Sequence, residues 1–215
     1  FAPSESSAPK LAFVIGLIVL FISLLSIRVV PNIIALATVV LVLFSPIIAA
    51  SLPDPTKPDN KVEFISNSAA HRLLIWRNTA ELIYKNPILG LGFDTTRSLY
   101  SKADRIVVEF NPGDQNNNWK GFFEPIPLHP HNGVLQIWLE LGVFGALALL
   151  CVLGRIFFLI REAILSHVEQ ALCLSTLTSG LTIFGLSYGA WQSWWLSVLL
   201  LITVYLVNVV QLKKL

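Results

Sequence analysis

This 215-residue sequence contains no methionine, only two cysteines and few charged residues, which make up 13% of the chain. Cys151 and Cys173 both fall in apolar stretches, so the polar segment 51–130 has no cysteine for a disulfide, and the redox compartment stays open. The same segment carries nine basic and nine acidic residues, and the whole chain has a formal charge of +2. That balance excludes nucleic-acid binding driven by a basic surface.

The first residues also lack an initiator methionine and the basic flank and cleavage site of a signal peptide. Phe1 is instead followed within ten residues by a long apolar run. We therefore expect this sequence to be the C-terminal part of a longer protein.

Long apolar runs occupy both ends of the chain, and 54% of all residues are hydrophobic. The uncharged runs 11–27 and 29–50 are separated by Arg28 alone. The first, of seventeen residues, is near the lower limit for crossing a hydrocarbon core of about 30 Å, and the second is a further run of this kind. Because the link is so short, the two helices must be antiparallel neighbours. Three further apolar stretches follow, at 133–160, 172–188 and 191–210. We predict an all-α fold, a polytopic membrane helical bundle with about five spans and one long loop that contains short helices.

The long loop opens after Ser51, where prolines and charged residues replace the apolar run. A helix is predicted at 68–84, with Ser68 as its N-cap, because apolar residues recur there every three or four positions. The residues of this apolar face are Leu73, Trp76, Ala80 and Ile83. Asn86-Pro87 ends the helix, and Gly90-Leu91-Gly92 is expected to form a flexible corner. Residues 112–121 are predicted to be an irregular turn region.

The positive charges of the short connections indicate the orientation of the spans. On the predicted topology one side of the membrane carries Arg28, Arg155, Arg161, Lys213 and Lys214. That side is predicted to be cytoplasmic, so the long loop faces outward. Trp191, Trp194 and Trp195 then fall near the outer face, where they are well placed for an interfacial aromatic belt. The chain divides into a first helix pair (1–50), the loop (51–131) and three C-terminal helices (132–215).

His129 and His131 flank a proline in the segment that leads into the apolar stretch beginning at Gly133. A histidine with a pKa near 6.5 can accept a proton at neutral pH, so either residue is a candidate general base. The alternative is an interfacial histidine whose nitrogens are satisfied by backbone carbonyls. A zinc site that adds His71 and Glu124 is also conceivable, although the spacing matches no common zinc pattern.

Three other polar residues are candidates for a site. Arg72 lies one helical turn before Trp76, and its guanidinium could bind a phosphate group through two hydrogen bonds. The alternative is a solvated amphipathic helix with surface arginines, and Arg77 lies on a different flank. Glu140 is expected close to the bilayer, where a carboxylate needs a partner such as a loop arginine. Equally, Gly142 and Gly145 near it could serve close helix packing.

Two motifs together resemble the O-antigen ligase and polymerase family of bacterial inner membranes. The first is RLLIWRNTAELIYKNPILGLGF, from Arg72 to Phe93, and the second is HPHNGVLQIWLELGVFG, from His129 to Gly145. Their order and their spacing of about forty residues on one loop make the resemblance specific. It covers most of the chain, because the last helix pair also fits the C-terminal end of that family.

The resemblance implies a metal-independent glycosyltransferase without a cofactor, in the bacterial inner membrane and with the loop 51–131 in the periplasm. The donor would be a glycan on undecaprenyl pyrophosphate, and in a ligase the acceptor would be a sugar hydroxyl of lipid A-core. By position, His131 would be the base on that hydroxyl, Arg72 would bind the pyrophosphate, and Asn132 would belong to the substrate site. The family usually has another arginine where Ser7 stands here, and Lys10, one turn onward, is the candidate to replace it.

Two alternatives stay open at this point. A polymerase of the same family would share the donor and the leaving group, and would differ in its acceptor. A non-catalytic membrane component or a transporter would not depend on Arg72 or His131, and Ser7 gives that alternative some weight. The nearly uniform apolar runs argue against a transporter, which should have polar or broken helices at the midplane.

Overall fold

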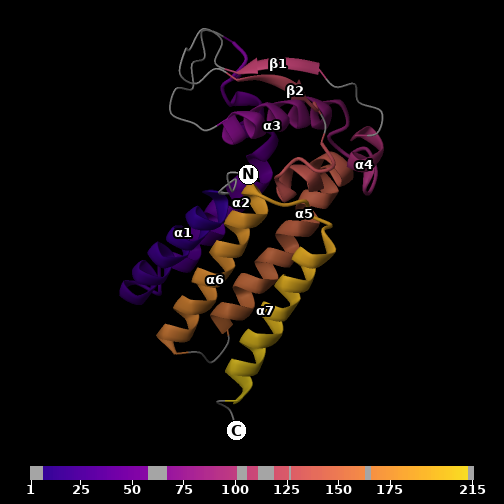
Figure 1. Ribbon diagram of the computed structural model, residues 1–215. Helices are drawn as coiled ribbons and strands as arrows, with labels where there is room; N and C mark the ends of the chain where they lie inside the picture. Colours follow the sequence, from indigo (N-terminus) through magenta and orange to yellow (C-terminus); the bar gives the residue numbers. More distant parts are fainter. Residues whose placement is uncertain are drawn as a thin grey trace. The chain divides into compact units, whose positions relative to one another are not determined.

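The computed structural model describes residues 7–57, 67–100, 106–110, 119–125, 127–162 and 166–212 (Figure 1). Most of these residues are helical, as predicted. The helices are α1 (Ser7–Leu25), α2 (Val30–Ser51), α3 (Asn67–Lys85), α4 (Thr95–Tyr100), α5 (Gly133–Glu162), α6 (His167–Leu186) and α7 (Ser193–Leu212). The chain forms two compact units, unit 1 with Phe1–Leu41 and Ala148–Leu215, and unit 2 with Val42–Leu147.

An antiparallel pair of strands, β1 (Ile106–Phe110) and β2 (Trp119–Phe123), adds a two-stranded sheet that the all-α prediction lacks (Figure 1). Ile106 pairs with Phe123, and Phe110 pairs with Trp119. The predicted turn region 112–121 is therefore wrong for residues 119–121, which belong to β2, while 112–118 lie outside the described residues. The run Ile106-Val107-Val108 is β-branched and was the available signal for a strand.

Three of the described helices are long and apolar enough to cross a membrane by length and composition. They are the spans Ala8–Leu25, Val30–Ser51 and Gly133–Glu162. The helix α6 begins with polar residues and carries several Ser and Thr side chains. In α7 the described apolar part is the shorter stretch Ser193–Val204. The count of five spans and the outward position of the loop therefore stay predictions.

In unit 1, α1 and α6 pack through small residues. Ser175 Oγ donates to the backbone oxygen of Gly16 at 2.8 Å, and Ser179 Oγ donates to that of Ala12 at 3.1 Å. A Cβ added at Gly16 would lie 2.1 Å from Ser179 Oγ, so a larger residue there would have to displace that hydroxyl group. Close packing of small residues and hydroxyl hydrogen bonds are the usual means of joining helices in lipid.

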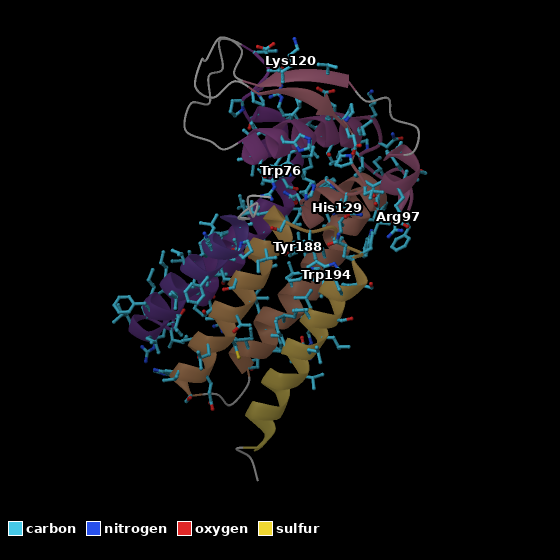
Figure 2. All side chains as sticks on the ribbon, in the orientation of Figure 1. Trp76, Arg97, Lys120, His129, Tyr188 and Trp194 are labelled. Atoms are coloured by element: carbon cyan, nitrogen blue, oxygen red, sulfur yellow. The ribbon has the colours of Figure 1, made fainter. Side chains whose placement is uncertain are left out.

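The connection between α6 and α7 carries an aromatic cluster in which Tyr188 packs edge to face against Trp194, with ring centroids 4.5 Å apart (Figure 2). Trp194 is half exposed, as a residue of an interfacial belt should be. Trp195 is only 4% exposed. The predicted belt therefore suits Trp194 better than Trp195.

In unit 2, the end of α2 is joined to α5 through a proline. Pro46 has no N–H group, so the backbone oxygen of Val42 lacks its usual partner four residues on. Trp138 Nε1 donates to that oxygen at 2.8 Å, and Ser45 Oγ donates to it at 3.2 Å. The backbone oxygen that Pro46 leaves without its helical partner thus holds the first part of α5 in place through Trp138.

The helix α3 is fixed to the end of α2 by Arg77, whose Nη1 donates to the backbone oxygens of Ala50, at 3.0 Å, and Leu52. An arginine on the last carbonyls of a helix is a common cap. Ser68 lies in the first turn of α3 and is not its N-cap, because α3 begins at Asn67.

The predicted apolar face of α3 is confirmed in part. Ala80 and Ile83 are buried, but Leu73 and Trp76 are only half buried. Leu74 and Ile75 are buried in their place. The buried face is thus turned relative to the predicted one, which leaves Trp76 free to bond elsewhere.

Candidate active site

The two sequence motifs of unit 2 meet at a break in α5. Gly142 has φ 61° and ψ −153°, a conformation that only glycine adopts readily, so the regular helical bonds stop there. The backbone oxygens of Leu139 and Glu140, released by the break, accept from the N–H groups of Leu91 and Gly92, each at 2.9 Å. In return, Val143 N donates to Pro87 O at 2.9 Å.

This exchange of hydrogen bonds corrects two expectations. The corner around Gly90 is held by backbone bonds and is not merely flexible. A Cβ at Gly142 would lie 2.2 Å from Ile88 O, so its close approach is to the loop and does not serve packing against another membrane helix. The Asn-Pro-x-x-Gly-x-Gly segment is therefore a partner of α5.

Glu140 lies within this break and is fully buried. Its Oε2 accepts from Asp94 N at 2.8 Å, and its Oε1 accepts from Thr96 Oγ1 at 2.6 Å and from Gln136 Nε2 at 3.0 Å. The expected need for a partner is met by these loop and helix groups. The carboxylate thus fixes the start of α4 to the first turns of α5.

Replacing Glu140 with glutamine should lower the free energy of unfolding by about 1–3 kcal/mol, because an amide N–H₂ group would then face a hydrogen-bond donor in a buried site. Denaturant unfolding of the purified protein would measure this loss. Glu81→Gln, at an exposed position of α3, is the matched control and should leave stability nearly unchanged. Equal stability of the Glu140 variant and the wild-type protein would contradict the structural role.

The segment between β2 and α5 holds the candidate base. His131 has φ 54°, a left-handed conformation that costs a residue with a side chain roughly 1–2 kcal/mol. His131 N donates to His129 Nδ1 at 3.3 Å, and the two rings lie edge to face with centroids 4.4 Å apart. Asn132 Oδ1 accepts from Leu135 N at 3.0 Å and so caps α5. The strained backbone at His131 thus lies between the hydrogen bond to His129 and the cap that Asn132 forms on α5.

Trp76 connects this segment to α3, because its Nε1 donates to Pro130 O at 2.9 Å. Figure 2 labels Trp76 on α3 and His129 in the segment before α5. Arg72 lies one turn before Trp76 on the same side of α3 and is half buried. Arg72 therefore lies on the same helix as Trp76, the residue whose hydrogen bond holds the segment with His129 and His131.

Burial and neighbouring charges lower the pKa values of His129 and His71. Burial and, next, the charge of His131 lower the pKa of His129 to about 4. Burial also lowers the pKa of His71, the charges of His131 and Arg72 lower it further, and the Glu124 carboxylate opposes the shift. His129 and His71 are therefore neutral at neutral pH, and both lie within the electrostatic reach of His131.

A cavity of about 180 Å³ lies beside His131, lined also by His129, Glu124, Pro127 and Leu128. Within the described residues, no group of three or more His, Cys, Asp or Glu is arranged to hold a metal ion, so the zinc set with His71 is not assembled there. The arrangement can take a proton from a hydroxyl group placed in the cavity.

The remaining predicted residue, Lys10, lies in α1 of unit 1 and its side chain is exposed. Ser7, which stands where the family arginine was expected, is the first residue of that helix. The substrate-binding roles of Lys10, Arg72 and Asn132 stay predictions. The sequence pattern did not indicate the structural roles of Arg77, Trp138 and Thr96. For Trp138, the available signal was Pro46, a proline within an apolar run.

Comparison with known proteins extends the resemblance. A family profile described as O-Antigen ligase matches residues 2–150. The chain is 33% identical over 193 residues to a protein of Rickettsia typhi, 34% over 195 residues to one of Rickettsia felis, and 30% over 195 residues to one of Rickettsia bellii. Each of the three is named "Putative polysaccharide ligase".

Each of these alignments covers 90% of this chain and 45% of the relative, so the chain spans about half the length of the curated relatives it matches. No solved structure matches the chain. The profile match covers more than half of the chain and includes both motifs that meet at Gly142. This membrane protein belongs to the O-antigen ligase family.

Proposed function

We propose that this chain carries the substrate site of a membrane glycosyltransferase that moves a glycan from undecaprenyl pyrophosphate to a sugar hydroxyl of lipid A-core. The observation that carries the proposal is the position of His131, held in a strained conformation beside a cavity at the start of α5. Strain of this kind gathers at functional sites. The ligase names of the relatives favour a ligase over a polymerase.

In the proposed reaction, a neutral His131 takes the proton of the acceptor hydroxyl. The acceptor oxygen forms a bond to the anomeric carbon of the donor sugar as the bond to undecaprenyl pyrophosphate breaks. The leaving group departs with the electron pair of that bond. Because burial keeps His129 and His71 neutral, neither adds a full positive charge that would oppose protonation of His131.

The cation for the leaving pyrophosphate is assigned to Arg72, whose guanidinium can offer two parallel hydrogen bonds to phosphate oxygens. Asn132 uses its Oδ1 to cap α5, so its Nδ2 is the group proposed to reach the substrate. The assignment of Lys10 to the donor rests on the sequence pattern alone. One base and one cation suffice for this reaction, so the proposed mechanism uses no metal and no cofactor.

The inner membrane and a periplasmic loop are the proposed location, because undecaprenyl-linked glycans and lipid A-core would meet there. The proposal predicts that cells lacking the full-length protein accumulate long glycans that are not attached to lipid A-core. Gel separation of lipopolysaccharide and of carrier-linked glycan would measure this. Single capped repeats in place of long chains would identify a polymerase, and unchanged lipopolysaccharide would contradict both.

Restoring such cells with Arg72→Ala should recover about 10- to 100-fold less transfer than the wild-type protein, because each lost charge-assisted bond is worth about 1.5–3 kcal/mol. Arg97→Ala is the matched control, since Arg97 is exposed and pairs with Asp94 at 3.2 Å on the surface of the same unit. Arg97→Ala should restore wild-type transfer. Full transfer by the Arg72 variant would remove Arg72 from the site.

A further inference from the structure

A second cavity, of about 440 Å³, lies wholly within unit 1. It lies where α1 and α5 end and where α2 begins. Its wall includes the link between α1 and α2, the last turns of α5 and the first turns of α6. In a membrane protein, the ends of apolar helices mark the boundary between hydrocarbon and water. The cavity therefore opens at the level of lipid head groups.

Two arginines from different helical segments line this cavity. Arg28 comes from the link after α1, and Arg161 comes from the last turn of α5. Arg161 Nη1 donates to Asn32 Oδ1 at 3.5 Å, which holds its guanidinium against the start of α2. The described lining residues include His167 and Gln170 as further polar groups, and no acidic side chain.

Two glutamates near this cavity, Glu162 and Glu169, do not belong to its lining. Glu169 accepts from Ser166 N at 2.8 Å and from Ser166 Oγ at 2.9 Å, as part of the cap of α6. Glu162 is exposed and does not line the cavity. The cavity is therefore basic.

The rest of the wall is apolar, with Ile27, Phe157, Ile160 and Leu174 facing the cavity. Two arginines beside an apolar wall suit an amphiphilic ligand with an anionic head group and hydrocarbon chains. A volume of about 440 Å³ is in the range of cavities that hold small-molecule groups. Basic pockets between membrane helices are suited to the phosphate head groups of acidic lipids.

We propose that this cavity binds the head group of an acidic phospholipid, with Arg28 and Arg161 on its phosphate diester and the apolar wall against the first carbons of its chains. Guanidinium groups match phosphate oxygens by paired hydrogen bonds. The site is independent of the proposed glycosyl transfer, because none of its residues belongs to the segment around His131.

Native mass spectrometry of the purified full-length protein in detergent tests this site, with dioleoyl phosphatidylglycerol as the acidic probe. Dioleoyl phosphatidylcholine and inorganic phosphate are the comparison probes. The wild-type protein should bind phosphatidylglycerol at least tenfold more tightly than phosphatidylcholine. Arg28→Gln with Arg161→Gln should weaken phosphatidylglycerol binding about tenfold or more, by loss of two surface cations.

Arg155→Gln is the matched control, because Arg155 lies on the same helix and is exposed, yet stacks against Phe158 and does not line the cavity. It should change lipid binding less than twofold. If the double variant does not fold, as judged by thermal melting, the two single variants serve, each with a loss of at least threefold. Equal binding of both lipids, equal loss in Arg155→Gln, or tighter binding of inorganic phosphate than of lipid would each overturn the proposal.

Discussion

Replacing His131 with alanine in the full-length protein should reduce glycan transfer about 10²- to 10⁴-fold, the usual contribution of a positioned general base. The variant keeps the N-cap at Asn132 and the anchor from Trp76, so its fold should persist. The measurement is transfer of glycan from its undecaprenyl carrier to purified lipid A-core, with protein amount and thermal melting recorded alongside. The acid limb of the pH–rate profile should flatten in the variant.

His129→Gln separates chemistry from local structure. His129 touches the backbone N–H of His131 and packs against its ring, but it is not the proposed base. We expect its replacement to reduce transfer less than about tenfold, because a glutamine can still accept that hydrogen bond. Wild-type transfer by His131→Ala would reject the catalytic assignment. Equal losses in both variants, with the acid limb unchanged, would show a positioning role only.

The helices could be predicted from the sequence because their signals are local. The apolar runs 11–27 and 29–50 became α1 and α2, which the structure bounds at Ser7–Leu25 and Val30–Ser51. The position of the histidine segment before α5 was also local, since Gly133 begins the apolar pattern there. In each case the pattern of neighbouring residues along the chain predicts the helix.

The contacts that organise unit 2 could not be predicted in the same way. The bond from Trp138 to Val42 O joins residues 96 positions apart, and it exists because Pro46 removes a donor. The pairing of β1 with β2 likewise depends on residues that are distant in the sequence, such as Ile106 and Phe123, so composition around 112–121 indicated only a loop. Sequence patterns indicate which polar residues are candidates, but not the distances between them.

Glu140 illustrates this limit within the site. Its place between leucines correctly indicated a carboxylate that needs partners. The partners are Thr96, Gln136 and the N–H of Asp94, and two of these three lie more than forty positions away in the sequence. The proximity of Arg72 to the histidine segment stays a prediction for the same reason, because it depends on how α3 meets the start of α5.

The break at Gly142 should be a sensitive backbone position. Gly142→Ala places a Cβ 2.2 Å from Ile88 O, in a φ/ψ region that residues with a side chain rarely occupy. The strained backbone costs about 1–3 kcal/mol and the steric conflict costs about 1–3 kcal/mol more. A domain is stable by only about 5–15 kcal/mol in total. We therefore expect the variant to melt at a much lower temperature or to accumulate poorly in membranes.

Gly154→Ala is the control for this prediction, because Gly154 lies in the same helix and a Cβ there meets no atom within 4 Å. Alanine in a helix interior should be neutral or stabilise by about 0.5–1 kcal/mol. Thermal melting in detergent compares the two variants directly. If Gly142→Ala melted with the wild-type protein, α5 would have to run unbroken. The carbonyl oxygens of Leu139 and Glu140 would then bond within α5, and the loop that carries the first motif would lose its attachment to the helix that begins beside His131.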